Sequence, residues 1–527
     1  MMRALRNLGR LMGIARTLAR FDALFPLDRL ALGPVLRAAI RLAALTAPKT
    51  GAEGADGEGG SDRTRDTAGA RLAQALQALG PSFIKLGQAL SVRSDLIGEE
   101  IADDLSALQD RLPPFSGAQA RAAIAAEFDR PAEELFASFD DEAIAAASIA
   151  QVHFAVTTEG REVAVKVLRP GIEAAFARDL DLFLWLAALL QRTQPALRRF
   201  KPVEVVEIFA ETVHIEMDLR LEAAAADELG RNFAGDGKFR VPEMDWVRTG
   251  RRVLTQQRIE GIPVDEAAAL IAAGHDVEAI VANMARCFFL QVFRDGFFHA
   301  DLHPGNLFVA GDGAIVAVDF GIMGRLDKRT RQYLAEMLLG FLTADYRRVA
   351  EVHVRAGYVP PDQSIDAFAQ AARAIAEPIL GLPLREISLA RLLAQLFGVA
   401  ARFRMETQPQ LLLLQKTMLV AEGVSRRLYP EANMWELARP LIEGWMADGM
   451  GADAQIRGAM DDFARGLERL PALIADMGGS VESLARDGLK LHPDSVQALT
   501  AARAERGTSW PLWAGAALIA VLVAVAL

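Results

Sequence analysis

The segment FFHADLHPGNLFV, residues 297–309, constrains this chain more than any other stretch of it. Eight of its positions, HADLHPGN, hold two histidines, an aspartate, an asparagine, a proline and a glycine between two apolar runs. Thirteen residues after Asn306, Asp319 opens the triplet DFG at the end of an apolar strand. Carboxylate and amide oxygens are ligands that suit Mg²⁺. The pattern therefore predicts a metal site formed by Asn306 and Asp319, although a surface loop would explain the segment taken alone.

A lysine in an apolar strand supports the first interpretation. Eight of the 58 basic residues are lysines, so arginine is the usual surface cation here. Lys166 nevertheless lies within VAVKVL, which matches the V-A-I-K strand of kinases, where the ammonium holds the nucleotide phosphates. Asp301 and Asn306 have the spacing of the kinase catalytic loop, so Asp301 would orient or deprotonate the acceptor. The alternative for Lys166 is an edge strand that directs the lysine to solvent.

The segment that precedes this strand departs from the kinase pattern. A kinase places a glycine-rich loop there, so that backbone N–H groups can approach the phosphates. This chain has Ala145, Ala146, Ala147 and Ser148 instead. Because the alanine Cβ disfavours positive φ, the loop is expected to be stiffer and differently shaped. Read in isolation, the stretch resembles the start of a helix.

The order of predicted elements defines a fold class. Helices come first, then a small strand-rich lobe with a turn at Glu159-Gly160, then a helical lobe with a two-strand hairpin. We expect an α+β, two-lobed, protein-kinase-like fold with an N-terminal helical extension over the cleft and a C-terminal transmembrane helix. The expected segments are 1–50, basic amphipathic helices; 51–66, a flexible linker; 67–136, the helical extension; 137–260, the N-lobe with inserted helices; 261–440, the helical C-lobe; 441–509, a helical tail; and 510–527, a membrane anchor.

Both ends of the chain have features of membrane proteins. The N-terminal 21 residues form an amphipathic pattern with arginines on one arc, which suits either an anionic membrane surface or packing on the protein. Residues 512–527 contain no charged side chain, with Trp510 and Trp513 at their start. At ~1.5 Å per residue they reach ~24 Å, short of a ~30 Å hydrocarbon core. We expect a membrane anchor rather than a buried terminal helix.

The charges near this tail predict its orientation. Arg503 and Arg506 precede the apolar segment, which favours an inner-membrane protein with its main body on the cytoplasmic side. The net charge of -10 gives no basic field for nucleic acid. The single cysteine, Cys287, excludes an intrachain disulfide, and its apolar surroundings predict core packing.

Five motifs together resemble the UbiB family of atypical kinases, over most of residues 67–330. They are KLGQ at 85–88, AAASIAQVH, VAVKVLRPG, EMDLRLEAAA and HADLHPGN. The resemblance implies binding of ATP with Mg²⁺, weak or conditional ATPase activity, membrane association and a role in ubiquinone biosynthesis. Ubiquinone-biosynthesis enzymes or quinone-like lipids would be its partners, and a homodimer is left open.

The resemblance also implies roles for particular residues. Lys166 would pair with Glu222, and Glu216, which forms an ExD element with Asp218, would pair with Lys85. Lys85 and Gln88 would lie on a helix over the nucleotide, so that Lys85, Gln88 and Glu216 join the alanine segment and Lys166 in nucleotide binding. Independently, acids four residues apart repel on a helix, so Asp218 and Glu222 favour a basic partner from elsewhere.

Some family features are missing. No A-P-E follows DFG, Gln256-Gln257 stands where the family has a hinge-like MEW, and the tail has room for one span where relatives often have two. Two other functions stay open. One is a small-molecule phosphotransferase, which shares the catalytic-loop pattern but not KLGQ or the anchor. The other is a nucleotide-dependent, lipid-binding scaffold without turnover. The sequence does not name the phosphate acceptor.

Overall fold

The fold is described from a computed structural model of the chain. The described residues are 2–24, 67–91, 98–106, 112–193, 201–379 and 408–432, with the short pieces 108, 198, 395–396, 398–400, 402–405, 440–441 and 444. The expected linker, nearly all of the helical tail and the membrane anchor lie outside them. Contacts divide the chain into residues 1–445 and 446–527, and the description concerns the first unit. None of the helices in the described ranges has the length and apolarity needed to cross a bilayer.

An antiparallel sheet forms the strand-rich lobe. Its strands are β1 (Phe136–Phe139), β2 (Ala145–Ala146), β3 (Ala150–Thr157), β4 (Glu162–Leu168) and β6 (Val253–Gln257). The order is β1-β3-β4-β6, with β2 also paired to β3. The predicted turn between β3 and β4 is confirmed, and Gly160 supplies its positive φ of 86°. The three valines of β4 stand at alternate positions and are all buried. They share one face of the sheet, because successive side chains of a strand point to opposite faces.

The valine face of β4 is covered by the helix α8 (Gly117–Phe128). Ala120 and Ile124 of α8 share one buried cluster with Val163, Val165 and Val253. The short helix α9 (Ala132–Leu135) leads directly into β1. The expected boundary between 136 and 137 therefore falls inside a packing unit, since residues 117–135 pack with the strand-rich lobe.

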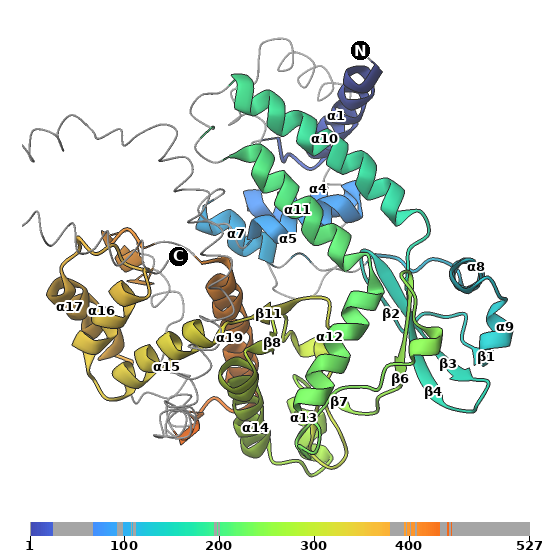
Figure 1. Cartoon of the computed structure of the whole chain (residues 1–527). Coiled ribbons are helices and arrows are strands. Elements are labelled where there is room, and N and C mark those ends of the chain that lie inside the picture. The colour runs from blue at the N-terminus through green and yellow to red at the C-terminus, as the bar shows by residue number, and fades with distance from the viewer. Residues whose placement is uncertain are drawn as a thin grey trace, which may run out of the picture. The chain divides into compact units, whose positions relative to one another are not determined.

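A separate helical group precedes and interrupts this lobe, and Figure 1 shows its members on the same side of the sheet. They are α1 (Met2–Arg20), α4 (Ala68–Leu79), α5 (Pro81–Ser91), α7 (Glu99–Ser106), α10 (Ile172–Thr193) and α11 (Pro202–Glu216). Their shared core includes Leu18 of α1, Ile84 of α5 and Leu182 of α10. On the polar side of α1, Arg10 Nε donates to Asp179 Oδ1 at 3.0 Å. Of the two alternatives for the N-terminal helix, the structure shows packing on the protein.

The second lobe has more strands than the predicted hairpin. The helix α12 (Leu219–Asn232) packs against β6 of the first sheet and leads toward this lobe. The helices of the second lobe are α13 (Ala267–Ala272), α14 (Val277–Phe289) with the π-helical turn η3 (Leu290–Asp295), α15 (Lys328–Leu342), α16 (Tyr346–Arg355), α17 (Ile365–Ala376) and α19 (Pro409–Leu428). Its first sheet has the order β5-β10-β9-β7, formed by β5 (Phe239–Arg240), β7 (Ile262–Pro263), β9 (Leu307–Val309) and β10 (Ile315–Ala317). A second sheet pairs β8 (Phe297–His299) with β11 (Met323–Arg325). Cys287 is buried in α14, as predicted.

The chain passes from one sheet to the other between β6 and β7. A Cβ on Gly261 would lie 3.0 Å from both the Phe308 Cβ and the Val309 carbonyl oxygen, so the crossing chain runs directly against β9. Gln256 and Gln257, the residues at the expected hinge, are instead the last two of β6 and pair with Ala164 and Val163.

Candidate active site

Lys166 occupies a central strand. It faces Val152 of β3 on one side and Leu254 of β6 on the other, so the edge-strand alternative is wrong. Its ammonium lies 2.8 Å and 3.0 Å from the two carboxylate oxygens of Glu222, on α12. It also lies 3.0 Å from Oδ1 of Asp319, which follows β10. One cation therefore joins β4 to the helix α12, which packs against β6 of the same sheet, and to an acidic residue of the second lobe.

The three charges of this cluster do not balance, because two carboxylates share one ammonium. Burial disfavours the ammonium of Lys166, yet the two carboxylates raise its pKa above the usual value. Burial raises the pKa of Glu222 to about 7, against the opposing effect of Lys166. The protein around Asp319 removes part of its hydration and so opposes its ionisation, but the nearby ammonium of Lys166 holds the pKa of Asp319 at about 2. Asp319 therefore stays ionised at neutral pH, which a metal ligand requires.

The β9–β10 hairpin brings the two predicted metal ligands together. Leu307 pairs with Ala317 at the open end of the hairpin. Just beyond this pair, the Val318 N–H donates to the Asn306 carbonyl at 2.9 Å. Asp319 follows with a φ of 61°, a left-handed backbone that costs a non-glycine residue about 1 kcal/mol or more.

The side chains of this hairpin suit a hard cation. The Asn306 amide nitrogen donates to the Asp301 carbonyl at 3.0 Å, which leaves the amide oxygen as the atom free to bind a cation. The Asp319 side chain is 49% exposed. An amide oxygen and an ionised carboxylate from adjacent positions fit Mg²⁺.

A buried histidine holds the catalytic loop, a role that the sequence interpretation did not assign. His299 Nδ1 accepts from the Asp301 N–H at 3.2 Å, so Nε2 carries the proton and donates to the Val318 carbonyl at 3.1 Å. Burial lowers the pKa of His299, which keeps the ring neutral in this geometry. The ring therefore connects the Asp301 loop to the strand that precedes Asp319. Its place at the start of HADLHPGN was the available signal.

The helix α19 also reaches this loop. The Thr417 hydroxyl is buried and shares its hydrogen between the Leu413 carbonyl in its own helix, at 2.8 Å, and the Ala300 carbonyl, at 3.0 Å. Its neighbour Lys416 places Nζ 3.6 Å from Oδ1 of Asp301. Sequence reasoning missed both residues. The available signal was a rare lysine inside the apolar run LLLLQKTMLV.

The ion pair expected between the extension and the kinase-like body is present. Lys85 Nζ of α5 lies 2.9 Å from Glu216 Oε2 of α11, and each side chain is 13% exposed. The charge of Lys85 also contributes to the low pKa of Asp319. Gln88 lies one turn further along α5 and is half-buried. The part of these three residues in nucleotide binding stays a prediction.

Asp218, the second acid of the ExD element, has a local role. Its carboxylate accepts from the Arg220 N–H at 3.2 Å and caps the N-terminus of α12. It therefore fixes the first turn of the helix that carries Glu222.

The alanine segment is a strand and a tight turn, not the start of a helix. Ala145 and Ala146 form β2, and the Ala147 N–H donates to the Ala150 carbonyl at 2.8 Å while Ser148 is buried. The Ala147 carbonyl accepts from Arg169 Nη2 at 2.8 Å, a contact that the sequence did not predict.

Two further residues of the motif AAASIAQVH, Gln151 and His153, have structural roles. The Gln151 side chain accepts from the Phe115 N–H at 2.8 Å and donates to the Phe115 carbonyl at 3.0 Å. It also lies 2.8 Å from His153, whose other ring nitrogen contacts the Asp140 carbonyl. These contacts tie β3 to the segment that precedes α8 and to the residue that follows β1.

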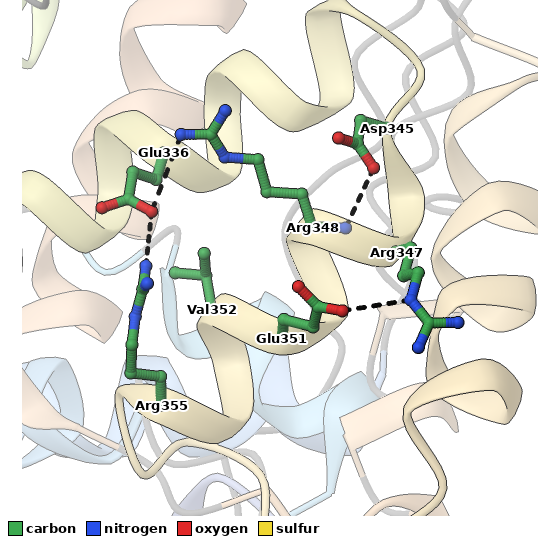
Figure 2. A pocket seen from close by; sticks show the side chains of 7 residues that line it. All are labelled: Glu336, Asp345, Arg347, Arg348, Glu351, Val352 and Arg355. Atoms are coloured by element: carbon green, nitrogen blue, oxygen red, sulfur yellow. Dashed lines mark hydrogen bonds and ion pairs between the residues drawn. The ribbon is translucent and has the colours of Figure 1, made fainter.

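A hollow of about 340 Å³ between α15 and α16 contains none of the predicted site residues. Figure 2 shows its lining, in which charges of opposite sign pair with one another. Arg347 contacts Glu351 at 3.1 Å, and Glu336 is contacted by both Arg355 and Arg348, the latter at 3.9 Å. Because the cations are neutralised within the lining, this hollow carries no functional assignment.

A lysine–glutamate pair, an Asp-x₄-Asn loop and an aspartate after a β-hairpin, set between two lobes, define a kinase-like protein. Residues 107–353 match the model of the ABC1 atypical kinase-like domain, and residues 372–433 match that of the UbiB helical domain. A Marinobacter nauticus protein described as "Probable protein kinase UbiB" is 43% identical over 464 residues, which cover 86% of this chain and 85% of that protein. The chain belongs to the UbiB family of atypical kinases.

A further relative and a solved structure are also similar to this chain. An Aeromonas hydrophila protein with the same description is 46% identical over 410 residues, 77% of this chain and 75% of the relative. The solved complex of Rv3197 with erythromycin, from Mycobacterium tuberculosis, is 25% identical with a TM-score of 0.51, and it covers 68% of this chain and 90% of that one. The family models and the UbiB relatives confirm the resemblance inferred from the five motifs.

Proposed function

We propose that this protein is a membrane-anchored atypical kinase or ATPase that binds Mg-ATP and supports ubiquinone biosynthesis. The observation that carries the proposal is the placement of Lys166 between Glu222 and Asp319. Together they set a cation for phosphates beside an ionised carboxylate for Mg²⁺.

The proposed roles follow from these positions. Lys166, held by Glu222, would bind the nucleotide phosphates, and the turn at Ala147 would lie against them through its backbone. Asn306 and Asp319 would hold Mg²⁺, which neutralises phosphate charge when bound. Asp301 would orient the acceptor and take its proton. An acceptor oxygen then bonds to the γ-phosphorus, and the bond to the bridging oxygen breaks with its electron pair leaving on ADP.

The cellular setting of the proposal rests on family membership and on the tail sequence. We place the protein at the inner membrane with its main body on the cytoplasmic side, and its partners would be ubiquinone-biosynthesis enzymes or quinone-like lipids. Sedimentation of the purified protein tests whether it forms a homodimer.

Phosphate release from Mg-ATP by the full chain tests the proposal, with and without vesicles that contain a quinone-like lipid. Turnover that rises with the lipid supports it. An Mg-ATP thermal shift without phosphate release under either condition would instead favour a nucleotide-dependent scaffold. The Lys166→Met variant is the control for a contaminating ATPase, because it removes the cation and leaves the rest of the chain unchanged.

A further inference from the structure

Lys416 lies where the helical region meets the catalytic loop. It belongs to α19, within the part of the chain that matches the UbiB helical domain. The buried hydroxyl of Thr417, the next residue, contacts the Ala300 carbonyl, the residue before Asp301. The register of α19 against this loop is therefore fixed within one residue of the lysine.

Lys416 places a positive charge beside the carboxylate of Asp301. The Asp301 backbone is held by His299, His303 and Asn306, which contact its N–H or its carbonyl. Among the described ion pairs, the one that the Asp301 side chain makes is with Lys416, at 3.6 Å. The two side chains are 35% and 41% exposed, so the pair stays open to a substrate.

The ion pair between Lys416 and Asp301 reduces a charge repulsion that the proposed reaction would otherwise create. A carboxylate that takes a proton from the acceptor must lie close to the acceptor, and therefore close to the anionic γ-phosphoryl group. Two negative groups at that separation repel unless a cation offsets them. A lysine beside the carboxylate supplies this cation without occupying the metal site.

We propose that Lys416 is a positioning residue of the transfer centre, supplied by the helical region that follows the kinase-like domain. It holds the Asp301 carboxylate toward the acceptor and offsets its charge as the phosphates approach. The acceptor proton still goes to Asp301, and the electron pair of the broken P–O bond still leaves on ADP. This inference rests on the proposed function.

The test is steady-state phosphate release by the full chain, with nucleotide affinity measured in parallel. Lys416→Met should lower kcat by about tenfold or more, because a positioned base contributes ~10²- to 10⁴-fold. The Kd for Mg-ATP should change less than about twofold, since Lys166, Asn306 and Asp319 are untouched. Lys416→Arg should recover most of the lost kcat because it keeps the charge. Lys328→Met, an exposed lysine at the start of α15, is the matched control and should leave kcat unchanged.

A second comparison separates a positioning role from a structural one. In an Asp301→Asn background, Lys416→Met should cause no further loss, because the carboxylate that it serves is gone. An equal loss in both backgrounds, or a wild-type kcat for Lys416→Met, overturns the inference. If Lys416→Met lowers the midpoint of thermal unfolding, the same two comparisons are made with Lys416→Gln. Absent turnover and absent nucleotide binding in the unmodified protein would overturn the proposed function itself, whereas turnover indifferent to Lys416 overturns only this inference.

Discussion

Lys85 and Glu216 form an ion pair that joins α5 to α11, with Nζ 2.9 Å from Oε2 and both side chains largely buried. Neither charge can be removed alone without leaving the other poorly solvated. Loss of one partner of a buried pair typically costs ~3–5 kcal/mol, more than the net stabilisation by the pair itself.

This relationship predicts the outcome of a double-mutant cycle. Lys85→Ala and Glu216→Gln should each lower the free energy of unfolding, and the double variant should lose less than the sum, with a coupling of about 0.5–3 kcal/mol. Both single variants should also shift nucleotide turnover in the same direction, without simple loss of ATP binding. Urea unfolding and phosphate release measure the two effects. Additive losses would show that the charges do not depend on each other.

Asp319→Asn should abolish Mg²⁺-dependent nucleotide binding while the fold survives. The change removes the ionised ligand, but it leaves the bonds between Lys166 and Glu222 in place. A thermal-shift titration with Mg-ATP measures the effect, and Asp265→Asn, an exposed residue of the same lobe, is the control. An undiminished shift in the Asp319 variant would remove this residue from the metal site.

Glu222 should make stability depend on pH. Its pKa rises on folding to about 7, so the folded chain holds this proton more tightly than the unfolded chain does. Its contribution therefore favours folding at low pH and is lost as pH rises from about 4.5 to 7, by up to about 3 kcal/mol. Glu222→Gln should flatten that part of the curve in urea unfolding at pH 5 and pH 7.5. Glu260→Gln, on an exposed residue, should leave the slope unchanged, and an unchanged slope in both variants would contradict the assignment.

Gly324 is predicted to tolerate no side chain. A Cβ at this position of β11 would lie 2.1 Å from the ring of Phe298, which is fully buried in β8. Gly324→Ala should therefore destabilise the protein by ~1–3 kcal/mol through overpacking, and it should impair turnover because β8 leads into the catalytic loop. Gly311→Ala meets no atom within 4 Å and should be close to neutral in the same thermal unfolding experiment. Equal midpoints for the two variants would show that β8 and β11 can separate without cost.

Deletion of the residues after Arg506 should release much of the protein from membranes. The apolar segment that begins at Leu512 supplies the largest partition term in the sequence, and α1 has its apolar side in the protein core. Fractionation of cells that express the full and truncated chains measures this. A truncated protein found wholly in the membrane fraction would assign anchoring to another part of the chain.

Sequence patterns predicted those parts of the fold that are local. The β3–β4 and β9–β10 hairpins follow from alternating apolar residues around a glycine turn, and both are confirmed. The strands that were missed are two to four residues long. β5 pairs with β10 in parallel, far away in sequence, so no local pattern marks it.

The same limit applies to the site. Lys166, Glu222 and Asp319 stand in motifs with a characteristic spacing, and the structure brings them together. Lys416 and Thr417 lie in a region that reads as continuous helix, where periodicity reveals an apolar face but not which loop that face meets.

The contact between Thr417 and Ala300 has a consequence for synthesis on the ribosome. Every motif residue of the site has been translated by the time Asp319 emerges, yet the backbone of the Asp301 loop gains this buried partner only when α19 is made. At ~5–20 residues per second, that delay is on the order of ten seconds. A nascent or prematurely terminated chain that ends before α19 would carry the whole kinase signature and still lack the helix that supports its catalytic loop.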